Sequence, residues 1–256
     1  LLKGLFQQNI FPDGRRTSFH RLHIWAATGL HGCMAHEGKT RLTLIRHGES
    51  NVTVERILGG EKSCTGLSDL GRDQASALRD RLEIEAMKVD ALYASTMPRA
   101  IETAEIIKPA LNVAELITDR ELVEHRPGEA DGKPYDELEE LFGSTDYYGR
   151  PHSSFASGAE SLQKFHFRVS DALEAVIARH VGENVVIVCH GGVIDVAIRQ
   201  LLDLPRRGQF DLWTLNTSLT EFAVDDREEK RGRWTLIRYN DHAHLAGLPF
   251  ATNLEQ

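Results

Sequence analysis

Two short runs of apolar or β-branched residues, each leading into a histidine, stand out in the pattern of hydrophobic and polar positions along this chain. Residues 42–45 run directly into Arg46 and His47. Residues 185–189 repeat the layout far downstream and run into His190. Continuous apolar runs of this length are typical of strands buried on both faces of a parallel sheet. Because open α/β sheets place ligands at the carboxyl ends of their strands, we expect both histidines to meet at one sheet edge.

Helical and extended patterns alternate through most of the remaining chain. Apolar residues three and four apart predict helices over about 71–87, 98–110, 160–180 and 193–202. Short apolar runs predict further strands at 91–94 and 113–118, and alternating segments predict a marginal hairpin at 218–224 and 233–239. This order predicts an α/β fold of three layers, α/β/α, with a mostly parallel sheet.

The two ends of the chain differ from its middle. Residues 1–40 hold more basic than acidic side chains and show no clear periodicity, so we expect a poorly ordered or non-native N-terminal extension with a natural start near Met34. An Arg-bearing targeting peptide is the alternative. We expect a single domain over 41–245 and a C-terminal tail over 246–256. Within the domain, the Gly-, Pro- and aromatic-rich segment at about 125–160 is predicted to form a lid over the strand ends.

Composition narrows the class of protein. With a formal net charge of -8, the chain lacks the basic excess of a nucleic-acid-binding scaffold. Its three cysteines are widely spaced and odd in number, which argues against a disulfide framework and favours a reducing, cytoplasmic location. No apolar run reaches the length of a bilayer span, so no membrane partner is expected. An acidic protein that binds anions must confine its positive charge to a pocket.

Two further features bring hydrogen-bond donors to the same sheet edge. Ser95 or Thr96 suits the N-cap of the helix predicted near residue 98, which places Arg99 in its first turn, facing the strand ends. Gly191 and Gly192 begin the helix after the second apolar run and should offer free backbone N–H groups there. Such an arrangement binds anions.

The groups expected at this edge are Arg46, His47, Arg99, Glu124 and His190. Two guanidinium groups and two imidazoles, with glycine N–H donors, suit a doubly charged phosphoryl group. The surrounding positive charge lowers the pKa of a histidine, which keeps one imidazole neutral for attack on phosphorus. A carboxylic acid at the rim would protonate the leaving alkoxide and then deprotonate an incoming water.

The motifs that carry these groups resemble those of the histidine phosphatase superfamily, which contains cofactor-dependent phosphoglycerate mutase and its phosphatase relatives. The likeness rests on four stretches in order along the chain, at residues 46–50, 95–104, 122–132 and 190–191. The resemblance implies a mostly parallel sheet with helices on both faces and a metal-free reaction that needs no cofactor.

Roles for individual residues follow from the same resemblance. It implies that His47 is phosphorylated, that Arg99 contacts the phosphate and that Glu124 donates the proton. His190 is similar to the second signature histidine, and its His-Gly context resembles the mutase-like branch. Asn51, four residues beyond His47, is the candidate for a phosphate-contacting asparagine that relatives often carry at a different spacing.

The compact stretch between Glu124 and His190 favours a phosphatase that hydrolyses small phosphomonoesters. Phosphoglycerate mutase-type transfer is one alternative, and a non-catalytic phosphate-binding or docking module is another. The expected partner is a small phosphorylated substrate or inorganic phosphate, and a homodimer is left open. Lid residues are the candidates for substrate choice: His125, Arg126, Lys133, Tyr135, Tyr147 and Tyr148. His242 and His244 lack a third ligand at metal-binding spacing, so we expect them on the surface.

Overall fold

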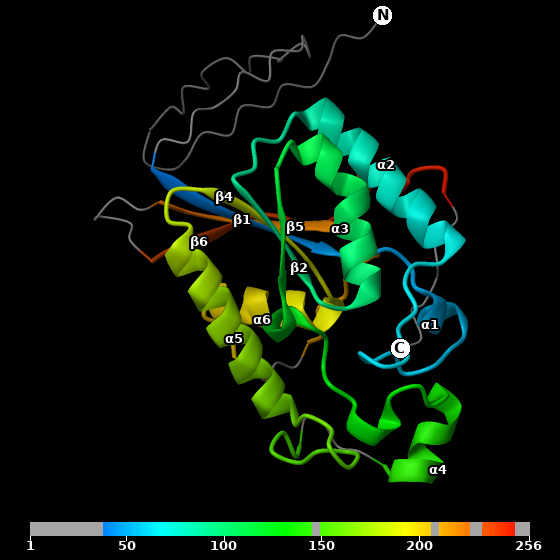
Figure 1. The fold of residues 1–256 in the computed structure, drawn as a ribbon. Helices are drawn as coiled ribbons and strands as arrows, with labels where there is room; N and C mark the ends of the chain where they lie inside the picture. Colours follow the sequence, from blue (N-terminus) through cyan, green and yellow to red (C-terminus); the bar gives the residue numbers. More distant parts are fainter. Residues whose placement is uncertain (1–37, 145–148, 206–209, 226–231, 249–256) are drawn as a thin grey trace, which may run out of the picture. The chain divides into compact units, whose positions relative to one another are not determined.

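A six-stranded sheet forms the centre of the computed structural model, which describes residues 38–144, 149–205, 210–225 and 232–248 (Figure 1). The strand order is β3-β2-β4-β1-β5-β6. Four strands pair in parallel: β3 (Leu116–Asp119), β2 (Ala91–Ser95), β4 (Asn184–Cys189) and β1 (Lys39–Arg46). The last two, β5 (Leu219–Asp225) and β6 (Trp234–Asp241), continue antiparallel at one margin. The predicted mostly parallel sheet and marginal hairpin are confirmed.

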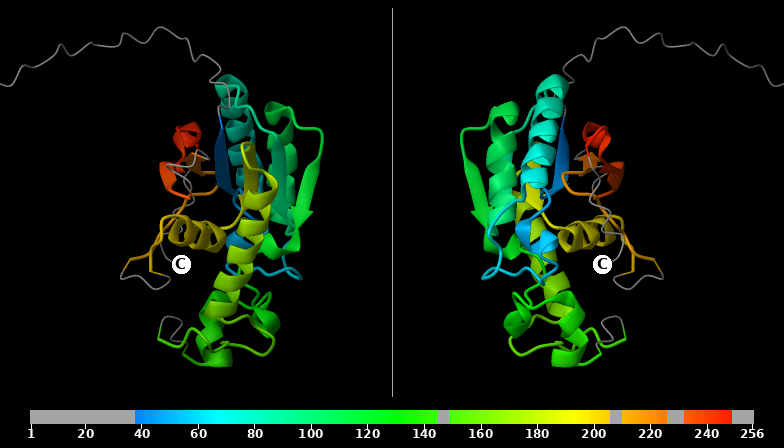
Figure 2. Two further views of the ribbon diagram at one scale, coloured as in Figure 1. Left: turned by 90° about the vertical axis from the view of Figure 1, so that its left-hand side faces the viewer. Right: turned by 90° about the vertical axis from the view of Figure 1, so that its right-hand side faces the viewer.

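Helices cover both faces of this sheet, as Figures 1 and 2 show. On one face, α2 (Asp69–Glu85) and α3 (Pro98–Leu111) pack over Ile45 and its neighbours. On the other face, α5 (Leu162–Arg179) and α6 (Gly191–Leu201) pack over Leu44. Successive side chains of a strand point to opposite faces, and both of these residues have no exposed surface. Two-sided burial therefore explains the continuous apolar runs, and the three-layer prediction is confirmed.

The predicted helices begin and end within a few residues of the observed ones, but one cap differs. The N-cap of α3 is Met97, and no side chain caps this helix. Ser95, expected as a cap, ends β2 instead, and its hydroxyl lies 2.6 Å from His190 Nε2. The remaining elements are short: α1 (Asn51–Val54), η1 (Arg120–Leu122), η2 (Gly128–Ala130), η3 (Tyr135–Glu137), α4 (Leu138–Phe142) and η5 (Ala243–Leu245).

The segment predicted as a lid contains η2, η3 and α4, and Figure 2 shows it gathered near the start of α5. Its role as a lid stays a prediction. The expected N-terminal extension and C-terminal tail fall mostly on residues 1–37 and 249–256, which lie outside the described residues.

Backbone contacts fix the loop that follows β1. A Cβ on Gly48 would lie 2.5 Å from the carbonyl oxygen of Gly71, and one on Gly71 would lie 2.0 Å from that of Glu49. Ser68 caps α2 by accepting from the Gly71 N–H, and its hydroxyl donates to the Glu49 carboxylate. The first turn of α2 thus packs directly against the loop that carries His47, and only glycine permits that distance.

Candidate active site

The two signature histidines lie together at the carboxyl ends of adjacent strands. His47 follows β1 and His190 follows β4, and these strands pair in parallel up to Arg46 and Cys189. The ring centroids are 5.0 Å apart, with 60° between the ring planes. His47 is only 5% exposed and His190 has no exposed surface. The structure therefore brings together the two imidazoles that the apolar runs placed at one sheet edge.

The hydrogen bonds of His47 define which ring nitrogen is free to react. Its Nδ1 lies 2.6 Å from the carbonyl oxygen of Gly48, which can only accept, so Nδ1 carries the proton. Nε2 accepts from Arg99 Nε at 3.0 Å and therefore holds a lone pair. Burial lowers the pKa of His47 well below its ordinary value, and the charges of Arg99 and Arg46 lower it further. His47 is thus a neutral imidazole whose Nε2 is its nucleophilic atom.

His190 holds a hydrogen-bond donor without a partner among the described residues, beside His47. Ser95 Oγ accepts from the Met97 N–H at 3.4 Å, which leaves its hydroxyl proton for His190 Nε2 at 2.6 Å. Nδ1 of His190 then carries the ring proton, since burial, with the charge of Arg99 next, lowers the pKa of this imidazole too. That Nδ1 is buried and has no hydrogen-bond partner within the described part of the chain.

Near Gly191, the residue after His190, two more buried polar atoms have no hydrogen-bond partner among the described residues: Arg46 Nε and Thr214 Oγ1. A Cβ on Gly191 would lie 3.9 Å from the first and 3.8 Å from the second, so both border Gly191. Unpaired buried polar groups cost free energy unless a partner completes them. Because all three atoms can donate, they suit a group rich in acceptor oxygens, such as a phosphoryl group.

The two guanidinium groups at the site lack a direct ion-pair partner among the described residues. Arg99 is 5% exposed and also donates to the Gly59 carbonyl at 3.2 Å. Arg46 donates to the Thr214 carbonyl. Neither guanidinium forms an ion pair with a carboxylate in the described ranges. Buried cations are normally paired, so this pair of arginines favours an anion bound between them.

Glu124 reaches the site from the irregular segment after β3. Its Oε2 accepts from the Gly192 N–H and its Oε1 from the His125 N–H, both at 2.9 Å. The expectation that Gly192 offers a free N–H is therefore wrong, because the Glu124 carboxylate occupies that donor. A cavity of about 300 Å³ joins these groups, and its lining includes Arg46, His47, Arg99, Glu124 and Gly191. Four of the five predicted groups thus line one cavity, and the fifth, His190, is buried next to His47.

Asn51, predicted to contact the phosphate, does not line this cavity. Its side-chain amide donates to Thr65 Oγ1 at 3.0 Å. Ser50 and Thr53, on either side of it, line the cavity instead. The proposed phosphate contact of Asn51 is thus not supported by its placement, because the short helix α1 turns its side chain toward the loop at residue 65.

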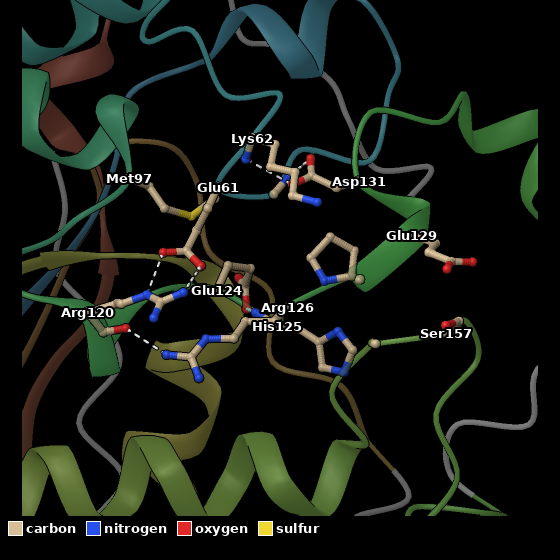
Figure 3. Close-up of a pocket in the computed structure, with 14 residues that line it drawn as sticks. Glu61, Lys62, Met97, Arg120, Glu124, His125, Arg126, Glu129, Asp131 and Ser157 are labelled. Atoms are coloured by element: carbon tan, nitrogen blue, oxygen red, sulfur yellow. Dashed lines mark hydrogen bonds and ion pairs between the residues drawn. The ribbon is translucent and has the colours of Figure 1, made fainter.

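A larger cavity of about 530 Å³ lies beside the first, and the two share Glu124 and His125. Figure 3 shows its wall, where Arg120 donates to both carboxylate oxygens of Glu61 at 3.0 Å. The other charged residues of its lining are Lys62, Arg126, Glu129 and Asp131. Because Glu124 borders both cavities, a leaving group held in the larger one would place its bridging oxygen near that carboxylate.

The candidates for substrate choice divide between the cavities. Arg126 lines the larger one, Tyr135 lines the smaller one and His125 lines both. Lys133 lines neither of the two. The last candidates lie outside the described residues: Tyr147 and Tyr148.

Sequence reasoning missed several contacts of the site. Trp213 and Thr214 line the smaller cavity from an irregular stretch before β5, and no periodicity or motif marks them. Ser95 lies at the end of a predicted strand, but its contact with His190 depends on the pairing of that strand with β4, which the sequence does not specify. The structure also corrects His244, which is half-buried with Nε2 2.9 Å from Thr217 Oγ1. Nowhere in the described ranges do three metal-ligating side chains cluster.

The described helices do not include one with the length and apolar character needed to cross a membrane.

The low pKa of His47 leads to a prediction for its titration. Followed by NMR, the imidazole of wild-type His47 should stay neutral well below about pH 6.5, the ordinary value. Arg99→Gln removes the nearest positive charge, so the pKa of His47 should rise. The free energy of unfolding should fall as pH drops below about 6.5. In that range His47 and His190 bind protons in the unfolded chain but stay neutral in the folded protein. Protonation of wild-type His47 near its ordinary pKa contradicts this account.

Comparison with known proteins gives consistent matches. The sequence model of the histidine phosphatase superfamily (branch 1) matches residues 42–242. Phosphoglycerate mutase-like protein 4 of Arabidopsis thaliana is 33% identical over 211 residues, 80% of this chain and 86% of the relative. The metal-independent phosphoserine phosphatase of Arabidopsis thaliana is 28% identical, over 82% of this chain and 85% of the relative. Among solved structures, Bacillus stearothermophilus YhfR superposes with a TM-score of 0.70 and 30% identity, over 80% of this chain and 99% of that one.

Proposed function

The chain belongs to the histidine phosphatase superfamily, and its named relatives include a phosphoglycerate mutase-like protein and a phosphoserine phosphatase. We propose that it hydrolyses small phosphomonoesters through a phosphohistidine on His47. One observation carries the proposal. A neutral His47 Nε2 faces a cavity where the guanidinium groups of buried Arg99 and half-buried Arg46 have no ion-pair partner among the described residues, and Glu124 lines the same cavity.

The first step transfers the phosphoryl group to the protein. Arg46, Arg99 and the Nδ1 proton of His190 bind its oxygens, which neutralises charge without a metal ion. His47 Nε2 bonds to phosphorus as the bond from phosphorus to the alcohol oxygen breaks. That oxygen takes the proton of Glu124, so the leaving group departs as a neutral alcohol.

The second step reverses the proton transfer. The Glu124 carboxylate removes a proton from water, whose oxygen bonds to phosphorus as the bond to His47 Nε2 breaks. Inorganic phosphate is released, and both side chains return to their starting states. If a second alcohol replaced water, the same residues would perform mutase-type transfer. The named mutase-like relative makes this the second candidate.

A substrate panel tests the proposal. Protein treated with a metal chelator should release phosphate from p-nitrophenyl phosphate and from L-phosphoserine, which the name of one relative makes the first metabolite to try. 3-Phosphoglycerate with and without 2,3-bisphosphoglycerate separates hydrolysis from mutase transfer. Absence of release from every ester between pH 5 and 8 overturns the proposed hydrolysis. Binding of inorganic phosphate without turnover would leave the docking module.

Glu124→Gln is predicted to lose activity in proportion to the basicity of the leaving group. General acid catalysis contributes about 10²- to 10⁴-fold, so kcat/KM for L-phosphoserine should fall by about 10²-fold or more. The loss for p-nitrophenyl phosphate should be much smaller, because its leaving group departs without a proton. Measuring both esters on one preparation checks this, and an equal loss on both assigns the acid elsewhere.

A further inference from the structure

Arg168 on α5 forms a buried ion pair outside both cavities. Its side chain is 7% exposed and that of Glu160 is 8% exposed. The two groups meet in parallel, Nε with Oε1 and NH2 with Oε2, each at 2.8 Å. This bidentate geometry fixes the plane of the guanidinium.

The remaining N–H groups of Arg168 bind the turn that carries Glu124. NH1 donates to the carbonyl oxygens of Glu121 and Val123 at 2.6 and 3.1 Å. NH2 donates to the carbonyl of Glu124 itself, at 3.3 Å. One side chain thus contacts three backbone carbonyls within four residues, at the point where Glu124 leaves the main chain.

Glu160 holds the same turn from its other end. Its backbone N–H donates to the Arg126 carbonyl at 2.8 Å, and its carboxylate accepts from the Arg126 N–H at 3.3 Å. The stretch has little support of its own, because β3 ends at Asp119 and η1 ends at Leu122. No strand therefore pairs with the backbone at Glu124 within the described residues, and the ion pair with Arg168 takes over that task.

From these contacts we infer that Arg168 is a positioning residue for the proposed acid. It fixes the backbone from 121 to 124 so that the Glu124 carboxylate reaches the Gly192 N–H and the cavity. The ring of Phe165, one turn earlier on α5, lies 5.3 Å from the Arg168 guanidinium carbon and packs at Gly192. The inference rests on the proposed function, since it gives Arg168 a role only where Glu124 transfers a proton.

The test compares phenyl phosphate with p-nitrophenyl phosphate, which are similar in shape but differ in leaving-group basicity. The constant kcat/KM reports the first step, in which the leaving group departs. Arg168→Met should lower kcat/KM for phenyl phosphate at least tenfold more than for p-nitrophenyl phosphate, roughly the cost of a misplaced acid. A residue that only supports the fold would lower both by the same factor.

Arg199→Met is the matched control. Arg199 is also buried, pairs with Asp195 at 2.7 Å and donates to the carbonyls of Pro205 and Phe210 at 2.9 and 3.1 Å. These contacts all lie away from the Glu124 turn, so any loss in this variant should be equal for the two esters. Arg168→Met/Glu160→Gln keeps the test open if the single variant fails to fold, because it leaves no unpaired buried carboxylate.

A double variant that combines Arg168→Met with Glu124→Gln tests whether Arg168 acts through Glu124. If Arg168 acts through Glu124, then adding Arg168→Met to Glu124→Gln should leave the ratio of kcat/KM for the two esters unchanged. Equal losses on both esters in Arg168→Met, or a further change of that ratio in the double variant, would overturn the inference while leaving the proposed hydrolysis intact. A wild-type protein without turnover on either ester overturns both.

Discussion

His47→Ala is expected to lower kcat by about 10⁴-fold or more on every ester that the wild-type protein hydrolyses. The proposed reaction divides into two steps only because Nε2 of His47 forms a bond to phosphorus. His190 cannot take over this role, since it directs Nε2 to Ser95 and holds a proton on Nδ1. Water would then have to attack the ester directly.

The covalent step can be observed directly. Wild-type protein quenched in alkali during turnover of a 32P-labelled ester should carry label that acid releases, and His47→Ala should carry none. His180→Ala is the matched control, because His180 binds Tyr93 and Glu183 at the other end of α5. It should keep both the adduct and the activity. Label retained in His47→Ala would place the nucleophile on another residue.

The sheet and its helices could be predicted because local patterns coincide with burial. Leu42 and Leu44 pack into one helical layer and Ile45 into the other, and the β-branched Thr43 between them is also buried, so the run lacks charged side chains. Leu78 and Leu82 predict the helix α2, because they lie four residues apart and are both fully buried. Such signals are carried within one element, and a single sequence contains them in full.

The contacts between elements were not predictable in the same way. Ser95 has the residue type and position of a helix cap, and only the parallel pairing of β2 with β4 brings it to His190. The sequence pattern places Arg168 on a helix but does not show its partners, which are backbone carbonyls more than 40 residues away along the chain. The phosphate contact predicted for Asn51 is not seen for a local reason. The short helix α1, which the sequence did not predict, directs its side chain to Thr65.

Gly192→Ala is expected to impair the acid while leaving the fold and the nucleophile in place. The added Cβ would lie 2.4 Å from Glu124 Oε1 and 3.0 Å from Phe165 Cζ. The carboxylate must therefore move by about an ångström and lose its bond from the Gly192 N–H, and a shift of that size can cost about 10²-fold in rate. Alanine is the better helix former by about 1 kcal/mol, which offsets part of the packing cost in α6.

Gly191→Ala is the matched control for this change, one residue earlier in the same helix turn. Its Cβ would meet nothing closer than 3.8 Å, and it would point toward Thr214 and Arg46 rather than Glu124. We expect a higher KM in that variant, with the ratio of kcat/KM for phenyl and p-nitrophenyl phosphate unchanged. In Gly192→Ala the same ratio should fall about tenfold or more, because only the ester with the basic leaving group needs the proton. Equal ratios in the two glycine variants would show that the Glu124 carboxylate does not act from the position that Gly192 gives it.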